Sequence, residues 1–252
     1  MRTTPRAITI ALAAVFTAAG ARGASAQHAG NGYLFHAPEA RITLRGGYAM
    51  ASARSDIFDD AVTNLTLSRR DFSGLAAGIE VGVMMADRWD ISVDASYSRA
   101  SKGSEFRHFI DNNNLPIEQT TLFERVPIMA SIRYYLTPPG RAIGRLAWIP
   151  AHAVPWVAAG AGTMFYKFEQ KGDFVDFRTS NVFPSTFTSS EWTPAVQGAG
   201  GFDVSLTPAL ALTTEARYIW ARGSVTQDFA GSGYNKVDLS GVQATVGLTI
   251  RM

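Results

Sequence analysis

The chain has 252 residues, of which 46% are hydrophobic and 17% are charged, and its formal net charge is +2. This length suits one large all-β domain or two smaller domains, and the near balance of charge gives no argument for a nucleic-acid partner. The chain contains no cysteine, so disulfide bonds do not hold its fold together. After residue 26 no stretch approaches 18 consecutive apolar residues, which excludes a helical inner-membrane protein.

The first 26 residues are typical of a Sec signal peptide rather than a retained anchor, because their apolar run is too short for a spanning helix. Arg2 and Arg6 precede this run. Ala24 and Ala26 form a small-x-small cleavage site before Gln27, so residues 1–26 are predicted to be removed. Their removal takes away three arginines and no acid, which leaves 20 basic and 21 acidic residues and a net charge of about −1. Residues 27–40 are predicted to form a periplasmic lead-in.

From Arg41 onward, apolar and polar residues alternate in a way that indicates β-strands with one apolar and one polar face. Eight such strands are expected, at residues 41–50, 74–85, 89–98, 125–136, 154–168, 192–206, 210–220 and 242–252. The connections between them have about 20, 2, 21, 17, 22, 2 and 15 residues. Long connections and very short ones therefore tend to alternate, as extracellular loops and periplasmic turns do in outer-membrane barrels. We predict an all-β fold, a closed antiparallel up-and-down transmembrane β-barrel over residues 41–252 with eight strands, or ten as the alternative.

The polar faces of these strands carry charges of both signs. The interior of an eight-stranded barrel is just wide enough for side chains, so we interpret the charges as a structural network of ion pairs that fills the lumen. A proton relay or a catalytic site is the alternative. The network is expected to comprise Arg45, Glu80, Asp94, Arg133, Asp203, Glu215 and Arg217. Four more charges are expected on the same inner surface, namely Asp90, Arg125, Lys167 and Arg251.

Tryptophans and tyrosines gather near the predicted strand ends, where amphipathic rings favour the lipid headgroup region. We interpret them as two interfacial girdles; the alternative is the core of a soluble sandwich, which the inner-face charges disfavour. The girdle residues are Trp89, Tyr97, Tyr134, Trp156, Tyr166, Trp192, Tyr218 and Trp220. In the strand at 154–168 glycines blur the alternation, and Trp156, Met164, Tyr166 and Phe168 are assigned to one apolar face, directed outward.

No motif of an enzyme is found in the sequence. The four histidines, at positions 28, 36, 108 and 152, are scattered without the spacing of a metal site. Residues 111–114 carry acidic and amide side chains but lack the full pattern of a calcium loop. We therefore predict a protein without catalytic residues, cofactor or metal.

Two segments, Pro155–Gly162 and Glu215–Trp220, together with the signal peptide and the eight alternating strands, resemble the OmpA/OmpW-type small outer-membrane barrels of Gram-negative bacteria. The pattern Thr245-x-Gly247-x-x-Ile250-x-Met252 is similar to the assembly signal of that family, with Met252 in place of the usual terminal Phe. The resemblance implies an outer-membrane location and a monomeric state. It also implies contact with outer-membrane lipid and lipopolysaccharide, and assembly by periplasmic chaperones and the barrel-assembly machinery.

Several functions are compatible with this resemblance. An OmpW-like narrow lateral path for small hydrophobic molecules requires an apolar pocket near the extracellular mouth, for which Phe123, Phe165 and Ile219 are suitable. Adhesion or surface defence requires only exposed loops, such as residues 101–121 and 169–190. A barrel enzyme that modifies lipid A would need a His/Ser/acid cluster at the membrane edge. A soluble lipocalin-like binder would need the opposite facing, with apolar residues inside.

Overall fold

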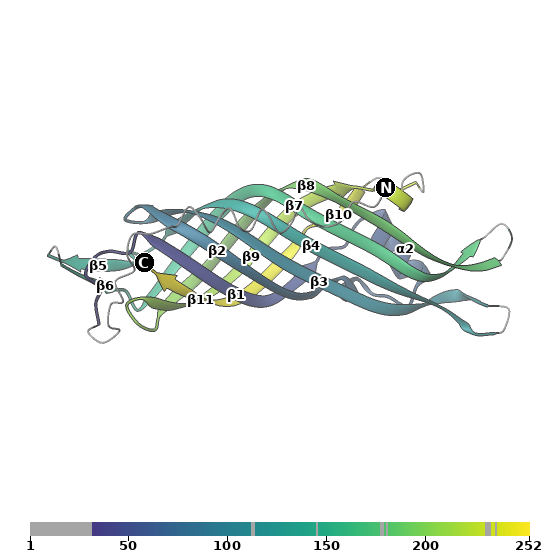
Figure 1. The fold of residues 1–252 in the computed structure, drawn as a ribbon, viewed down its shortest axis with the longest axis horizontal. Helices are drawn as coiled ribbons and strands as arrows, with labels where there is room; N and C mark the ends of the chain where they lie inside the picture. Colours follow the sequence, from purple (N-terminus) through teal and green to yellow (C-terminus); the bar gives the residue numbers. More distant parts are fainter. Residues whose placement is uncertain are drawn as a thin grey trace.

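The computed structural model describes residues 32–111, 114–144, 146–176, 179, 181–229, 233–234 and 236–252. The predicted signal peptide and its cleavage site at Ala24, Ala26 and Gln27 lie outside these residues. Within them, eight long strands form a closed antiparallel barrel, so the predicted fold class is confirmed (Figure 1). The barrel strands are β1 (Ala40–Ala51), β2 (Gly74–Ala86), β3 (Trp89–Ile110), β4 (Pro116–Tyr135), β7 (Ala153–Asp176), β8 (Asn181–Ser205), β9 (Leu210–Ser224) and β11 (Gly241–Arg251).

Each barrel strand pairs with its neighbour in the sequence, and the barrel closes where β11 pairs with β1. In this last pairing Arg41 lies opposite Arg251 and Met50 lies opposite Val242. The strict alternation of residues 242–251 reappears as a strict alternation of exposed and buried side chains along β11. A closed ring leaves no unpaired strand edge, which is the condition for placing a sheet in lipid.

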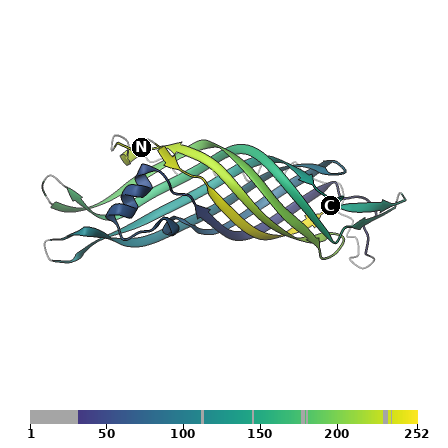
Figure 2. The same cartoon turned by 180° about the vertical axis from the view of Figure 1, so that it is seen from behind.

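The two ends of the barrel are built differently. At one end are the short connections 87–88 and 206–209, and the longer connection 136–152, which folds into a hairpin of β5 (Gly140–Ile143) and β6 (Ala147–Pro150). At the other end lie α2 (Asp56–Asn64), η1 (Arg69–Phe72), η2 (Gln227–Phe229) and the short strand β10 (Lys236–Asp238). Figure 2 shows α2 at the end opposite to β5 and β6. We refer to the end with the short turns as periplasmic and to the α2 end as extracellular, following outer-membrane barrels.

No helix among the described residues is long and apolar enough to cross a membrane.

Two of the predicted loops are strands in the structure. Residues 101–110 continue β3 and pair with β4, for example Lys102 with Thr121, and residues 169–176 continue β7 and pair with β8, for example Lys171 with Thr186. The two hairpins extend beyond the barrel at the extracellular end (Figure 1). Sequence reasoning missed these extensions because a hairpin with water on both faces does not need an apolar face, so its sequence lacks the two-residue alternation.

The predicted facing of β7 is wrong. Trp156 and Tyr166 lie inside the barrel with 1% and 0% of their surface exposed, and therefore do not belong to the girdles. Lys167, predicted to face the lumen, instead points outward and pairs with Glu169 at 2.7 Å. The prediction assumed that the apolar face of every strand meets lipid, whereas part of this lumen is itself apolar. The small residues from Ala158 to Gly162 do not indicate which face of β7 meets lipid, so the sequence did not correct this assumption.

Candidate functional site

The middle and periplasmic part of the lumen is filled by a network of buried ion pairs. Arg45 of β1 lies at its centre and donates hydrogen bonds to Glu80 (2.6 Å) and Asp94 (2.7 Å). Glu80 also accepts from Arg133 (2.7 Å) and pairs with Arg41 (2.5 Å). The structure places all seven residues of the predicted network in the barrel interior, where each is buried: Arg45, Glu80, Asp94, Arg133, Asp203, Glu215 and Arg217.

Further contacts join the network to every side of the barrel. Arg217 of β9 donates to Asp94 (2.7 Å) and to Glu215, its neighbour on the same face. The guanidinium of Arg133 stacks on the ring of Trp156, 3.7 Å from its centroid, and the Trp156 indole donates to Asp203 (3.1 Å). Buried ions are tolerated when they are paired and hydrogen-bonded in this way, because the attraction then offsets the loss of hydration.

In this arrangement the side chains of facing strands hold one another across the lumen. The carboxylates are paired with guanidinium groups, and one of them, Asp203, also lines a cavity at the periplasmic end. Among the described residues no group of three or more His, Cys, Asp or Glu side chains could hold a metal ion. Moving a small ion along the lumen would require breaking several of these pairs at once.

The extracellular part of the lumen is mainly apolar. It also holds the predicted inner charge Arg125, whose guanidinium packs on Phe123 and donates to the carbonyl of Leu239 (3.3 Å). Side chains from the barrel wall, including Phe123, Met129, Met164, Phe168 and Ile219, form one buried cluster. From the connection between β1 and β2, helix α2 adds Ile57, Phe58 and Ala61 to this cluster. We call this cluster the apolar compartment.

Phe58 is the central contact between α2 and the barrel. Its ring makes edge-to-face contacts with Phe72 (4.7 Å between centroids), Phe123 (5.2 Å) and Phe168 (5.5 Å). Asp56 and Asp59 lie in the first turn of α2, where a negative charge is favourable for the helix dipole. The helix therefore closes the extracellular mouth with its apolar face turned inward.

A cavity of about 300 Å³ lies above the apolar compartment, between α2 and the two projecting hairpins. Its lining is rich in aromatic side chains, with Phe106, Phe174, Phe187, Phe229 and Tyr234. Ala61, Leu65 and Phe229 belong both to this lining and to the apolar compartment, so the two are continuous. Burial, together with a hydrogen bond to Asp60, raises the pKa of the Tyr234 phenol above its usual value. We call this cavity the vestibule.

The barrel wall changes its bonding beside the apolar compartment. The backbone pairing of β8 with β9 ends at Ala195 and Ala221, just below Pro194, which has no N–H to donate. Above this point side chains join the two segments instead. Thr193 donates to the carbonyl of Arg222 (2.7 Å), Glu191 accepts from the Ser224 N–H (3.2 Å), and Asp228 accepts from the Thr188 N–H (2.9 Å). We call this stretch the β8–β9 seam.

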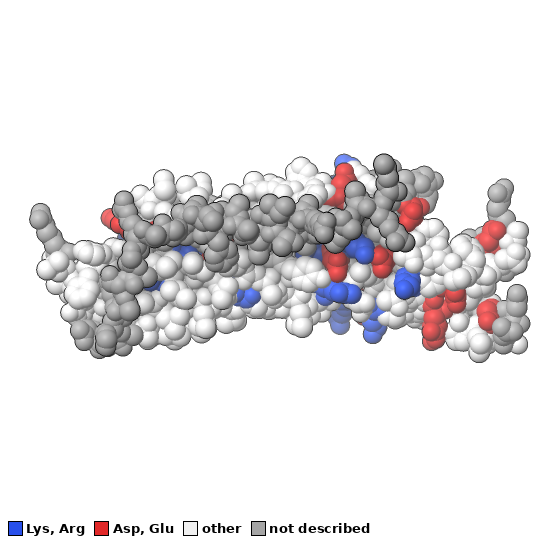
Figure 3. All heavy atoms as spheres, viewed as in Figure 1, with Lys and Arg blue, Asp and Glu red and all other residues white. Residues whose placement is uncertain are grey.

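The outer surface has the two-belt organisation of a membrane-embedded barrel. Trp89 packs on Tyr134 toward the periplasmic end (4.6 Å between centroids). Toward the extracellular end Trp192 packs on Phe165 (5.5 Å) and Tyr218 on Trp220 (6.0 Å). Large exposed apolar side chains cover the wall around and between these pairs, among them Leu44, Val83, Ile91, Val93, Ile132, Val196, Val246 and Leu248. On the face seen in Figure 3, charged side chains gather toward the extracellular end.

This surface identifies an integral outer-membrane β-barrel, because an apolar belt between aromatic girdles on a closed barrel matches the hydrocarbon core of a bilayer and its two interfaces. The remaining predicted girdle residue, Tyr97, is exposed, and its hydroxyl donates to Glu124 (2.8 Å). In the predicted assembly signal, Ile250 and Met252 point outward while Thr245 and Gly247 face inward.

Sequence reasoning missed the contribution of the connection between β1 and β2. Of the residues proposed for an apolar pocket, Phe123 and Ile219 belong to the apolar compartment, whereas Phe165 faces outward against Trp192. Ile57, Phe58 and Ala61 were not singled out. Their helical spacing, within a stretch read as polar because of its acids, was the signal that could have found them.

Comparisons with known proteins give matches in structure alone. No family model matches the chain, and no curated protein matches it in sequence. Among solved structures, OprG from Pseudomonas aeruginosa is 16% identical, with 87% of this chain and 99% of that chain covered and a TM-score of 0.46. Neisserial surface protein A is 14% identical, covering 84% and 97%, with a TM-score of 0.45. A major outer membrane protein from Thermus thermophilus is 8% identical, covering 86% and 100%, with a TM-score of 0.47. All three TM-scores are below 0.5, so the placement of this chain in the outer membrane rests on its own closed barrel and apolar belt.

Proposed function

We propose that this outer-membrane barrel admits small apolar molecules from the extracellular side and releases them sideways into the membrane. The observation that carries the proposal is the apolar compartment, which is continuous with the vestibule above it and reaches the β8–β9 seam at Ala195 and Ala221. An aromatic vestibule of about 300 Å³ has the size and lining of a site for a small apolar ligand.

The ion-pair network supports sideways release over passage through the lumen. An apolar molecule that moved toward the periplasm would have to displace Arg45, Glu80 and Asp94 from one another without offering them new partners. Separating such buried ions is strongly unfavourable, so the apolar compartment is closed toward the periplasm.

Helix α2 is suited to act as the movable closure. It belongs to the connection of residues 52–73 and its buried face meets the barrel through Ile57, Phe58 and Ala61. A short segment outside the hydrogen-bonded ladder opens at lower free energy than the barrel around it. Displacing α2 would expose Phe123 and Phe168 to a ligand of the same apolar character as Phe58.

The β8–β9 seam supplies the proposed exit. Side-chain hydrogen bonds such as Thr193 to Arg222 exchange without disturbing the register of the barrel, which a break in a backbone ladder would not allow. At the end of the ladder the two facing residues are alanines, Ala195 and Ala221, so little side-chain volume separates the apolar compartment from lipid.

The proposal is tested by the entry of N-phenylnaphthylamine into intact cells, followed by the fluorescence that this probe gains in membrane. Cells that express the protein are expected to show a faster initial rate than cells that lack it. Ala195→Phe, which fills the compartment beside the seam, is expected to remove the gain, whereas Ala216→Phe on the lipid-facing side of β9 is expected to keep it. Equal rates with and without the protein would contradict the proposal.

Surface adhesion is the second candidate, favoured by the two hairpins that extend beyond the barrel. Replacing residues 176–181 by a two-residue turn shortens the β7–β8 hairpin and keeps Phe174 and Val175 of the vestibule. A loss of cell attachment with unchanged probe entry would assign the hairpin to adhesion. Unchanged attachment would remove this candidate for that hairpin.

A further inference from the structure

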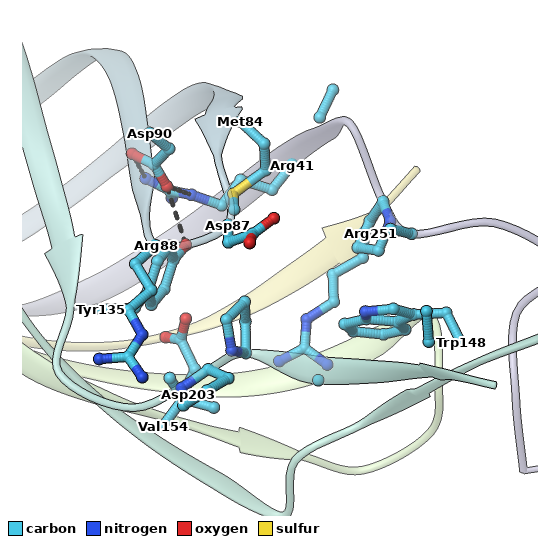
Figure 4. Close-up of a pocket in the computed structure, with 17 residues that line it drawn as sticks. Arg41, Met84, Asp87, Arg88, Asp90, Tyr135, Trp148, Val154, Asp203 and Arg251 are labelled. Atoms are coloured by element: carbon cyan, nitrogen blue, oxygen red, sulfur yellow. Dashed lines mark hydrogen bonds and ion pairs between the residues drawn. The ribbon is translucent and has the colours of Figure 1, made fainter. Parts of the chain in front are cut away.

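A second cavity, of about 420 Å³, lies at the periplasmic end, on the other side of the ion-pair network from the apolar compartment (Figure 4). The hairpin of β5 and β6 folds over this end together with the segment that precedes β1. Leu34 of that segment and Trp148 of β6 exchange two backbone hydrogen bonds of 2.9 and 2.7 Å. Trp148 packs closely on Gly140, where an added Cβ would approach the indole ring to 2.3 Å. The cavity is therefore bounded by a formed cap and not by a loose loop.

One buried arginine at this cavity lacks an ion pair. Arg251 of β11 is only 9% exposed and reaches inward into the cavity (Figure 4). Among the described residues it forms no ion pair, and its one side-chain hydrogen bond goes to the neutral hydroxyl of Ser205 (2.9 Å). A guanidinium has five N–H donors, so most of this donor capacity remains available to a ligand.

Two of the three acids that line the same cavity, Asp90 and Asp203, are paired with arginines of the ion-pair network, Arg41 (2.8 Å) and Arg133 (3.8 Å). Asp90 accepts from Arg41 (2.8 Å) and from the Tyr135 hydroxyl (2.8 Å). Asp203 accepts from Trp156 (3.1 Å) and from Thr213 (2.8 Å). Arg88 and the third acid, Asp87, also line the cavity without an ion pair in the part of the chain that the structure describes, and Asp87 is exposed to solvent. The buried charge of the lining that is left without an ion pair is therefore that of Arg251.

We propose that this cavity binds a small organic carboxylate with a flat apolar body. Arg251 would hold the carboxylate, because a guanidinium matches a carboxylate with two parallel hydrogen bonds. Trp148, Met84 and Val154 supply apolar lining for the remainder of the molecule. A volume of about 420 Å³ falls in the range of small-molecule sites, and an inorganic anion would leave most of it unfilled. This site is separate from the extracellular path and does not depend on it.

The test is calorimetric titration of the detergent-purified protein with naphthoate. Naphthylmethanol, which has the same rings but no carboxylate, is titrated in parallel to measure partition into the micelles. Wild-type protein is expected to bind one naphthoate in addition to that partition. Arg251→Gln is expected to weaken binding at least about tenfold. Arg141→Gln, on the exposed side of β5 and outside the cavity lining, is expected to bind as the wild type does.

Three results would overturn the proposal: equal binding by wild type and Arg251→Gln, equal binding of naphthylmethanol and naphthoate, or inorganic sulfate binding as tightly as naphthoate. Each variant is first checked for a folded barrel by its heat-dependent gel migration. If Arg251→Gln does not fold, Arg88→Gln replaces it, with a smaller but measurable weakening expected. Unchanged naphthoate affinity in Arg88→Gln would then count against the site.

Discussion

The two halves of the lumen are filled by different chemistry and by different parts of the chain. In the periplasmic half, charged side chains of the wall itself, such as Arg45, Glu80 and Asp94, hold one another across the barrel. In the extracellular half, apolar side chains of the wall are covered by α2, which comes from a connection outside the wall. The first filling cannot leave without unfolding the barrel. In the proposed function the cover of the second, helix α2, moves away while the wall stays intact.

Removing one charge from the periplasmic half is expected to have the largest effect on stability. Glu80→Gln leaves Arg41, Arg45 and Arg133 with a neutral partner in a buried site, which should lower the free energy of unfolding by about 3–5 kcal/mol. The measurement is urea unfolding in detergent micelles, followed by tryptophan fluorescence. Glu118→Gln on the exposed face of the β3–β4 hairpin is the control, with little change expected.

A change on the outer wall tests whether both halves lie in lipid. Val246→Arg places a charge on the exposed apolar face of β11. It should make folding into bilayers less favourable by about 2–4 kcal/mol. Ser101 lies on the exposed part of β3 above the apolar belt. Ser101→Arg should therefore change the free energy of folding by less than about 0.5 kcal/mol. Equal tolerance of the two substitutions would mean that the belt has been assigned to the wrong part of the wall.

Removing the aromatic contact of α2 is expected to loosen the extracellular half alone. Phe58→Ala deletes a ring that packs on Phe72, Phe123 and Phe168, with a local loss of about 3 kcal/mol. Proteolysis of the connection 52–73 should accelerate, while the unfolding transition of the barrel should shift much less than in Glu80→Gln. Thr63→Ala, on the exposed face of α2, is the control. If the barrel transition moved as far as in Glu80→Gln, the two halves would not be separable.

Breaking an ion pair on the outer surface is expected to have the smallest effect on the free energy of unfolding. It provides a reference for the buried ion pairs. Lys167 and Glu169 lie 2.7 Å apart with partly exposed side chains, so Lys167→Gln should change the free energy of unfolding by less than about 1 kcal/mol. The effect should also shrink with added salt. A large effect that is insensitive to salt would show that Lys167 is buried, as the sequence had suggested.

The sequence predicted the strands of the barrel better than it predicted which side chains fill the lumen. Strands such as β3 and β11 have an outer apolar face and an inner polar face, and this two-residue alternation gave their facing and the position of Glu80, Asp94 and Arg217. The same rule failed in β7, where Trp156 and Tyr166 are apolar and yet face the lumen. It failed because alternation shows that two faces differ, but not which face meets lipid.

The association of α2 with the apolar compartment could not be read from the sequence either. It depends on contacts between Phe58 and residues far along the chain, Phe123 and Phe168, which only the closed barrel brings together. The role of residues 137–153 also depended on tertiary contacts, because the cap is formed by pairing Trp148 with Leu34. Neither contact follows from local alternation or from a turn signal.

The most direct test of the account is to fix α2 in place and measure entry of an apolar probe. Thr66 and Glu105 are exposed and face each other across a short antiparallel bridge, and the chain contains no other cysteine that could interfere with a disulfide between them. In Thr66→Cys/Glu105→Cys, oxidation would tie the end of α2 to β3, and reduction would release it. We expect N-phenylnaphthylamine to enter cells slowly in the oxidised state and at the wild-type rate after reduction, with each single cysteine variant insensitive to both treatments. Rapid entry in the oxidised state would contradict the account.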